Sequence, residues 1–122
     1  MKQIIFFLAV TLFIACSKSG GDTEKPTITL GSPTSNQHFT AGQVVNITGS
    51  ITDNDELHHV HIMVTDKTHS SEVIHFEEHA DAKTYNFNKS FTAQAATTYK
   101  IHVEADDHVG NIAVVEIEVN GN

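Results

Sequence analysis

The sequence predicts an all-β domain, an antiparallel β-sandwich of about seven strands, and two observations carry this prediction. From Pro26 onward, short runs rich in Val, Ile, Thr, Phe and Tyr are separated by groups of Gly, Asn, Asp and Ser. Within these runs apolar residues recur at every second position, and no stretch keeps the 3.6-residue period of a helix. Seven such runs in about 95 residues are typical of the immunoglobulin-like class of sandwich.

The expected strands follow from the alternation. Thr27–Leu30 is a short first strand that ends before Gly31 and Pro33, and residues 43–52 alternate cleanly. Further strands are expected at 57–65, 72–78, 84–91, 99–105 and 112–119. The inward positions that should form the core include Val45, Ile47, Val60, Ile62, Phe87, Ile101, Val103 and Ile117.

Composition excludes several classes of function. Cys16 is the only cysteine, so the chain has no intrachain disulfide and no cysteine-based zinc site. Seven basic residues stand against fifteen acidic ones, a formal net charge of −8, which argues against nucleic-acid binding. Nine histidines are an unusual enrichment, and with an ordinary pKa of about 6.5 they make the surface charge sensitive to mildly acidic pH.

The N-terminus predicts an export signal and a lipid anchor. Lys2 precedes an apolar run that ends at Ala15, and Ala15-Cys16 resembles a bacterial lipobox, which implies cleavage before Cys16 and lipid on its sulfur. Residues 1–15 are then the signal peptide, 16–25 the lipidated cysteine and a flexible tether, and 26–120 the domain. The alternatives are an ordinary secretory signal or an uncleaved anchor. The expected location is the cell envelope, at the outer membrane, facing the periplasm or the cell surface.

Three stretches carry a resemblance to a known family. Residues 26–33 (PTITLGSP), residues 42–57 (GQVVNITGSITDNDEL) and residues 104–113 (EADDHVGNIA) look like parts of bacterial extracellular Ig-like domains. Over nearly all of residues 26–119 the chain is similar to small His-rich Ig-like lipoproteins of the Bacteroidetes type, a family of unknown function. The resemblance implies an envelope location and supplies no chemistry.

One outward face is expected to carry a metal-binding cluster. Alternation puts His59 and His61 on one face of the third strand, and a simple hairpin adds His75 from the next strand. His102 points outward on the strand that normally lies beside the third one. Imidazoles with nearby carboxylates suit Zn²⁺ or Cu²⁺. The alternative is a hydrophilic face that happens to be rich in histidine.

Two further stretches contain candidate metal ligands. Residues 75–79 match the H-x-x-E-H pattern of zinc peptidases, but that pattern works on a helix, and this stretch is expected to be a strand. Asp53 and Asp55 follow the second strand, Asp106 and Asp107 follow the sixth, and in the immunoglobulin-like topology both loops lie at one pole. These carboxylates could hold Ca²⁺, or could simply support the turns.

The sequence therefore predicts a binding protein rather than an enzyme, and no catalytic residue is assigned. The membrane is its expected partner through the N-terminal lipid. The leading hypothesis is transition-metal binding by the outward histidines, and the alternative is a metal-free module that meets a protein or glycan at the cell surface.

Overall fold

The computed structural model describes residues 21–122, so the predicted signal peptide and Cys16 lie outside the described residues. This part of the chain forms six strands: β1 (Thr27–Ser32), β2 (His38–Phe39), β3 (Val44–Asp66), β4 (Ser71–Thr92), β5 (Thr97–Asp107) and β6 (Ile112–Gly121). Residues 21–122 contain no helix long and apolar enough to cross a membrane.

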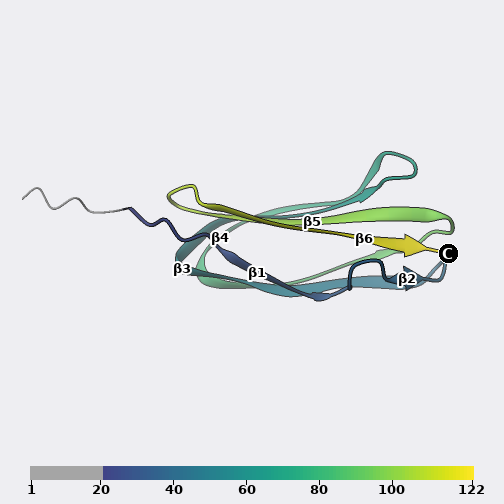
Figure 1. Cartoon of the computed structure of the whole chain (residues 1–122), viewed down its shortest axis with the longest axis horizontal. Coiled ribbons are helices and arrows are strands. Elements are labelled where there is room, and N and C mark those ends of the chain that lie inside the picture. Colours follow the sequence, from purple (N-terminus) through teal and green to yellow (C-terminus); the bar gives the residue numbers. More distant parts are fainter. Residues whose placement is uncertain (1–20) are drawn as a thin grey trace, which may run out of the picture.

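The strands form two packed layers that share their two longest members (Figure 1). The first half of β3 pairs with β1 and with the second half of β4, from Val44 opposite Thr92 to Thr52 opposite Thr84. The second half of β3 pairs with the first half of β4 on one side and with β5 on the other. Beyond β5 lie antiparallel β6 and then the short parallel strand β2.

The predicted all-β, immunoglobulin-like sandwich is confirmed, with six strands instead of about seven. The expected strands 43–52 and 57–65 are one bent strand, β3, and those at 72–78 and 84–91 are one strand, β4. Residues 53–56, expected as a turn because of their Asp and Asn content, stay extended where β3 passes between layers. Strand β2 has two residues, too few to show a period, and it was not predicted.

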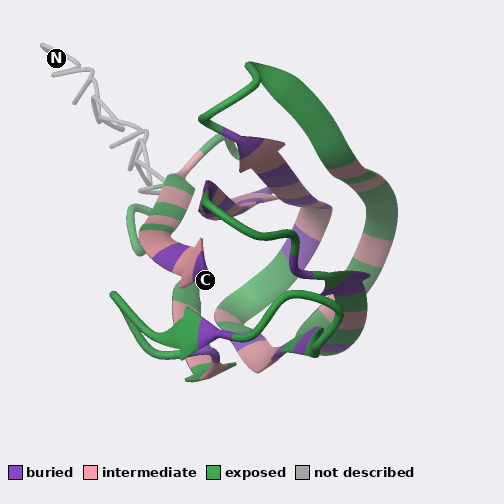
Figure 2. Ribbon diagram, turned by 90° about the vertical axis from the view of Figure 1, so that its right-hand side faces the viewer, coloured by how far each residue is buried: buried purple, intermediate pink, exposed green. Residues whose placement is uncertain are grey.

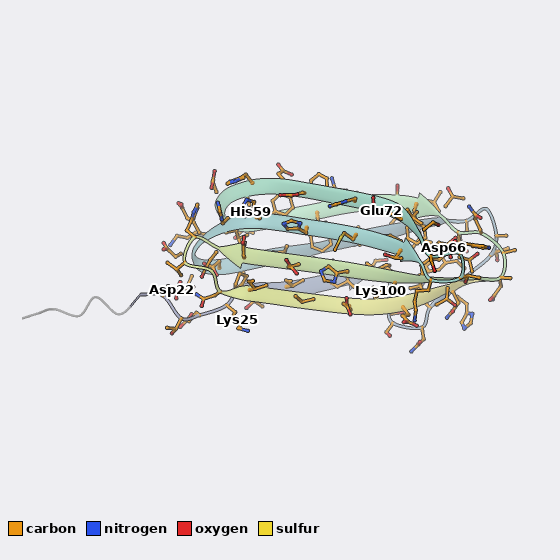
Figure 3. All side chains as sticks on the ribbon, turned by 90° about the horizontal axis from the view of Figure 1, so that it is seen from above. Asp22, Lys25, His59, Asp66, Glu72 and Lys100 are labelled. Atoms are coloured by element: carbon orange, nitrogen blue, oxygen red, sulfur yellow. The ribbon has the colours of Figure 1, made fainter. Side chains whose placement is uncertain are left out.

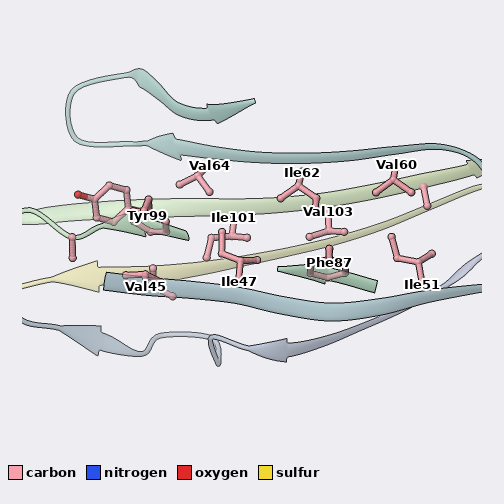
Figure 4. Close-up of a cluster of buried hydrophobic side chains, with 14 of the residues drawn as sticks. Val45, Ile47, Ile51, Val60, Ile62, Val64, Phe87, Tyr99, Ile101 and Val103 are labelled. Atoms are coloured by element: carbon pink, nitrogen blue, oxygen red, sulfur yellow. The ribbon is translucent and has the colours of Figure 1, made fainter. Parts of the chain in front are cut away.

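The core lies between the layers (Figures 2 and 4), and it includes the residues predicted by alternation together with Phe39, Leu57 and Ala93, which were not predicted. Val45, Ile47, Val60, Ile62 and Val103 are fully buried. Phe87 and Ile101 are also buried, and Ile117 packs against this core from a partly buried position. Each buried aliphatic side chain of this size stabilises the fold by about 1.5–3 kcal/mol.

Candidate metal centre

Most histidines lie on the outer face of the sheet formed by β4, β3, β5 and β6. The strand registers define three rows across β4, β3 and β5: His79, His59 and Asp106; then Glu77, His61 and Glu104; then His75, Met63 and His102. The four histidines proposed from the sequence, His59, His61, His75 and His102, all belong to these rows. Figure 3 shows His59 on this face, toward the end of the sandwich where the described chain begins.

A β-bulge brings a further histidine, His58, close to His59. Leu57 of β3 lies opposite Asp107 of β5, and His59 lies opposite Asp106. Asp107 and Asp106 are consecutive, so His58 is an extra residue on β3 without a partner on β5. Such bulges bend the strand and redirect side chains. Here the rings of His58 and His59, neighbours in the chain, come to 3.7 Å between centroids.

Four rings then form what we call the histidine cluster: His58, His59, His79 and His108. The ring of His79 lies 4.5 Å from that of His58 and 4.2 Å from that of His59, centroid to centroid. His108, in the β5–β6 turn, lies 4.6 Å from His58. One ligand nitrogen from each of His58, His59 and His79 falls within 4.8 Å of the others, the arrangement of a three-histidine metal site.

Two aspartates flank the histidine cluster. Asp106 Oδ1 accepts a hydrogen bond from the backbone N–H of His59 at 2.7 Å and lies 3.2 Å from the Nδ1 of the same residue. Asp81 Oδ1 lies 3.2 Å from His108 Nε2 and 3.7 Å from His79 Nδ1. A carboxylate at Nδ1, as at His59 and His79, orients the imidazole and leaves its Nε2 free for a metal, as the outer partners of ligating histidines do. His108 faces Asp81 through Nε2, which leaves its Nδ1 free instead.

The protonation of His58 responds to this environment. Burial lowers its pKa below the ordinary value, and the positive charges that His59, His79 and His108 carry when protonated lower it further, against the opposite effect of Asp106. A lowered pKa keeps the imidazole neutral, and the neutral form is the one that binds a metal. Without metal, the lowered pKa of His58 makes the free energy of unfolding decrease as pH falls through about 6.5, because the unfolded state binds the proton first.

A second group lies one row further along the face. His61, His75 and Glu77 also offer three ligand atoms within 4.8 Å of one another. His75 and Glu77 are exposed, whereas His61 is half-buried. The rings of His59 and His61 lie 6.1 Å apart, so the second group adjoins the histidine cluster.

His102 lies outside both groups. Its Nδ1 is 2.7 Å from Glu116 Oε1, and its Nε2 is 3.4 Å from Glu104 Oε2. The hydrogen bonds from His102 and from Lys100 lower the pKa of Glu116. Met63 separates His102 from His75 in their common row, which is why the two do not meet.

The structure thus divides the four proposed histidines. His61 and His75 come together with Glu77, His59 joins His58 and His79, and His102 pairs with glutamates. The H-x-x-E-H stretch is part of strand β4, as expected, and its two histidines belong to different groups. Sequence reasoning missed His58, His79 and His108.

The carboxylates proposed for Ca²⁺ are also redistributed. Asp53 and Asp107 lie together with Asp22, and one oxygen from each falls within 4.8 Å of the others; we call these three residues the aspartate cluster. Asp106 faces the histidines instead, and Asp55 is exposed and donates its backbone N–H to Asp53 Oδ1. Asp22 was assigned to the tether, so it was not considered as a ligand.

The fold and these groups define an Ig-type sandwich with histidine and aspartate clusters at one end. Residues 26–103 match the family described as bacterial Ig domain, and the chain belongs to that family. No curated protein matches it as a relative.

Among solved structures the chain is similar to superoxide reductase (neelaredoxin) from Ignicoccus hospitalis, with a TM-score of 0.52 and 8% identity over 81% of each chain. A variant of that reductase gives a TM-score of 0.51 and 7% identity over 80% of each chain. At these identities the likeness shows a shared fold alone.

Proposed function

We propose that this protein is a lipid-anchored Ig-domain protein of the bacterial cell envelope that binds Zn²⁺ or Cu²⁺ at the histidine cluster. The observation that supports the proposal is the convergence of His58, His59 and His79 nitrogens within 4.8 Å. Nitrogen ligands of one tetrahedral Zn²⁺ stand about 3.4 Å apart, given bonds of about 2.0–2.1 Å. Small side-chain rotations would therefore close this site.

The surroundings also favour a cation. Asp106 and Asp81 lie beside the histidines and would offset the charge of a divalent ion, and the chain as a whole carries a net charge of −8. His108 is near enough to His58 to serve as a fourth ligand, with a water molecule as the other choice. The proposal assigns metal binding and no catalysis.

The envelope location is supported by the bacterial Ig family and by the likeness of Ala15-Cys16 to a lipobox. The likeness to small His-rich Ig-like lipoproteins of the Bacteroidetes type supports it too. Replacing Cys16 by Ser should release the protein from the membrane fraction and abolish its labelling with palmitate, because the acylated sulfur is lost. Detergent phase partition and labelling of cells expressing both forms provide the measurement. A Cys16→Ser protein that stays labelled and membrane-bound would contradict the anchor.

Metal binding should be visible as a rise in melting temperature. At free Zn²⁺ a hundredfold above the dissociation constant, stabilisation reaches about 2.7 kcal/mol, which corresponds to about 10 °C for a domain of this size. The rise should appear at pH 7.5 and nearly vanish at pH 5.5, where protons compete for imidazole nitrogens. The measurement is thermal unfolding of the full chain in detergent, after metal removal, with and without Zn²⁺ or Cu²⁺.

Substitutions separate the two histidine groups. His79→Ala should abolish the Zn²⁺ response with little effect on the metal-free protein, because this side chain is 57% exposed. His61→Ala should keep the response, since His61 belongs to the adjoining group. His38→Ala, on β2, is the matched control. Equal responses in the His79→Ala and His38→Ala proteins would refute the histidine cluster as the site.

A second candidate function has an observation of its own. Ile112 and Val114 on β6 are 47% and 49% exposed, and they lie opposite Asp106 and Glu104, so they form a short apolar strip beside the histidine rows. Such a strip suits contact with another protein. If metals leave the melting temperature unchanged, the metal-free interaction module becomes the preferred function.

A further inference from the structure

The aspartate cluster joins three segments that are distant in sequence. Asp22 precedes β1, Asp53 lies where β3 bends between the layers, and Asp107 ends β5. One oxygen from each falls within 4.8 Å of the others. Figure 3 shows Asp22 at the end of the sandwich where the described chain begins.

Two oxygens of the aspartate cluster lack any hydrogen-bond partner. The Oδ2 atoms of Asp22 and Asp53 are buried from solvent, and no group in residues 21–122 donates a hydrogen bond to either. Buried carboxylate oxygens are normally paired with donors or with a cation. The lysine ion pairs of the described part involve Glu118 and Glu116, so no lysine there neutralises the three carboxylates.

Asp107 is buried and accepts hydrogen bonds within its own turn. Its Oδ1 accepts from the backbone N–H groups of Val109 and Asn111, both at 2.9 Å, and its Oδ2 accepts from Asn111 Nδ2 at 2.6 Å. Asp107 is 2% exposed, so a buried carboxylate stands beside those of Asp22 and Asp53. Like charges at this spacing repel each other unless a cation lies among them.

We propose that Asp22, Asp53 and Asp107 form a Ca²⁺ site, distinct from the histidine cluster, that fastens the segment before Pro26 to the domain. Carboxylate oxygens are the ligands that a hard cation such as Ca²⁺ prefers. Ca²⁺ takes six to eight oxygen ligands, some of them water. The side chain of Asn111 already links two members, because its Nδ2 donates to Asp107 Oδ2 at 2.6 Å and to the backbone oxygen of Asp22 at 3.2 Å.

The proposed Ca²⁺ site has a mechanical consequence for the protein. Asp22 belongs to the predicted tether, whereas Asp53 and Asp107 belong to the sandwich, so a bound ion would cross-link the two. The tether would then end before Asp22 when Ca²⁺ is bound and before Pro26 when Ca²⁺ is absent. Calcium would set how freely the domain moves relative to its anchor.

Proteolysis at Glu24 tests this directly. Glu24 is exposed and lies between the proposed ligand Asp22 and the folded domain, so a Glu-specific protease should cut after it when the segment is released. With Ca²⁺ tenfold above its dissociation constant, cleavage of the full chain should slow about tenfold, because only the ion-free form opens. The cut is followed by mass spectrometry, and melting temperature is recorded in parallel.

Asp53→Asn is the informative variant, because an amide oxygen can still accept the hydrogen bond from Asp55 while the charge is lost. It should weaken Ca²⁺ binding at least about tenfold, since affinity depends on the number of charged ligands. Asp22→Asn should do the same, and it changes a residue outside every strand. Asp55→Asn, exposed and outside the aspartate cluster, is the matched control.

The outcomes are separable from those of the transition-metal site. His79→Ala should keep the full Ca²⁺ response, since it is not a member of the aspartate cluster. No Ca²⁺ effect on cleavage and melting of the wild-type protein would overturn the proposal. So would equal protection of the Asp53→Asn and Asp55→Asn proteins, whatever the result with Zn²⁺.

Discussion

Replacing Gly49 by Ala should destabilise the domain by about 3 kcal/mol or more, because the added methyl group has no room. A Cβ at this position would lie 2.3 Å from the backbone oxygen of Thr29 on β1 and 2.4 Å from the ring of Phe87 on β4. Phe87 is itself buried in the core, so it cannot turn away, and moving Thr29 would break the β1–β3 pairing. Urea unfolding followed by circular dichroism measures the effect.

Gly31→Ala is the matched control for Gly49→Ala. Gly31 lies on β1, and the nearest atom to its added Cβ is Thr48 O at 3.4 Å, an ordinary contact. The change should stay within about 0.5 kcal/mol. If the two alanine variants unfold at the same urea concentration, the close packing of β1, β3 and β4 around Gly49 is wrong.

Ile62→Ala should cost about 2–4 kcal/mol in the free energy of unfolding, as a large-to-small change in a core does. Ile62 is fully buried, opposite Phe76 on β4 and Val103 on β5. Its removal takes away apolar contacts and leaves a cavity that regular strands cannot collapse to fill.

The control for Ile62→Ala is Asn86→Ala, an exposed position on β4, which should change the free energy by less than about 0.5 kcal/mol. Both variants are compared by urea unfolding. An unchanged slope of the unfolding free energy against urea concentration shows that the substitution has not altered the unfolded state. A cost below about 1 kcal/mol for Ile62→Ala would contradict its place in the core.

Period-2 alternation predicts most of the core, because residues on the buried face of a strand are apolar at every second position. Val45, Ile47, Val60 and Ile62 were placed correctly for this reason. Alternation does not show whether two successive runs form one continuous strand or two strands with a turn between them, because a bend between layers and a turn contain the same polar residues. Residues 53–56 illustrate this.

The histidine cluster could be predicted only in part. Alternation gave the correct face for His59 and His61, but a bulge interrupts the period and adds His58. The sequence contains a signal for this bulge: Leu57 and Val60 are both apolar although they are three positions apart, and a regular strand would place them on opposite faces. The structure buries both. His79 and His108 depend on the register of β4 and on the β5–β6 turn, and neither can be derived from a single sequence.

The sharing of β3 and β4 between the two layers bears on how the domain loses its structure. In a sandwich whose sheets have separate strands, one sheet could melt while the other persists. Here one layer contains the first half of β3 and the second half of β4, and the other layer contains the remaining halves, so neither layer keeps its partners once the other is lost. The domain should therefore unfold as a single cooperative unit, with one transition seen by every probe.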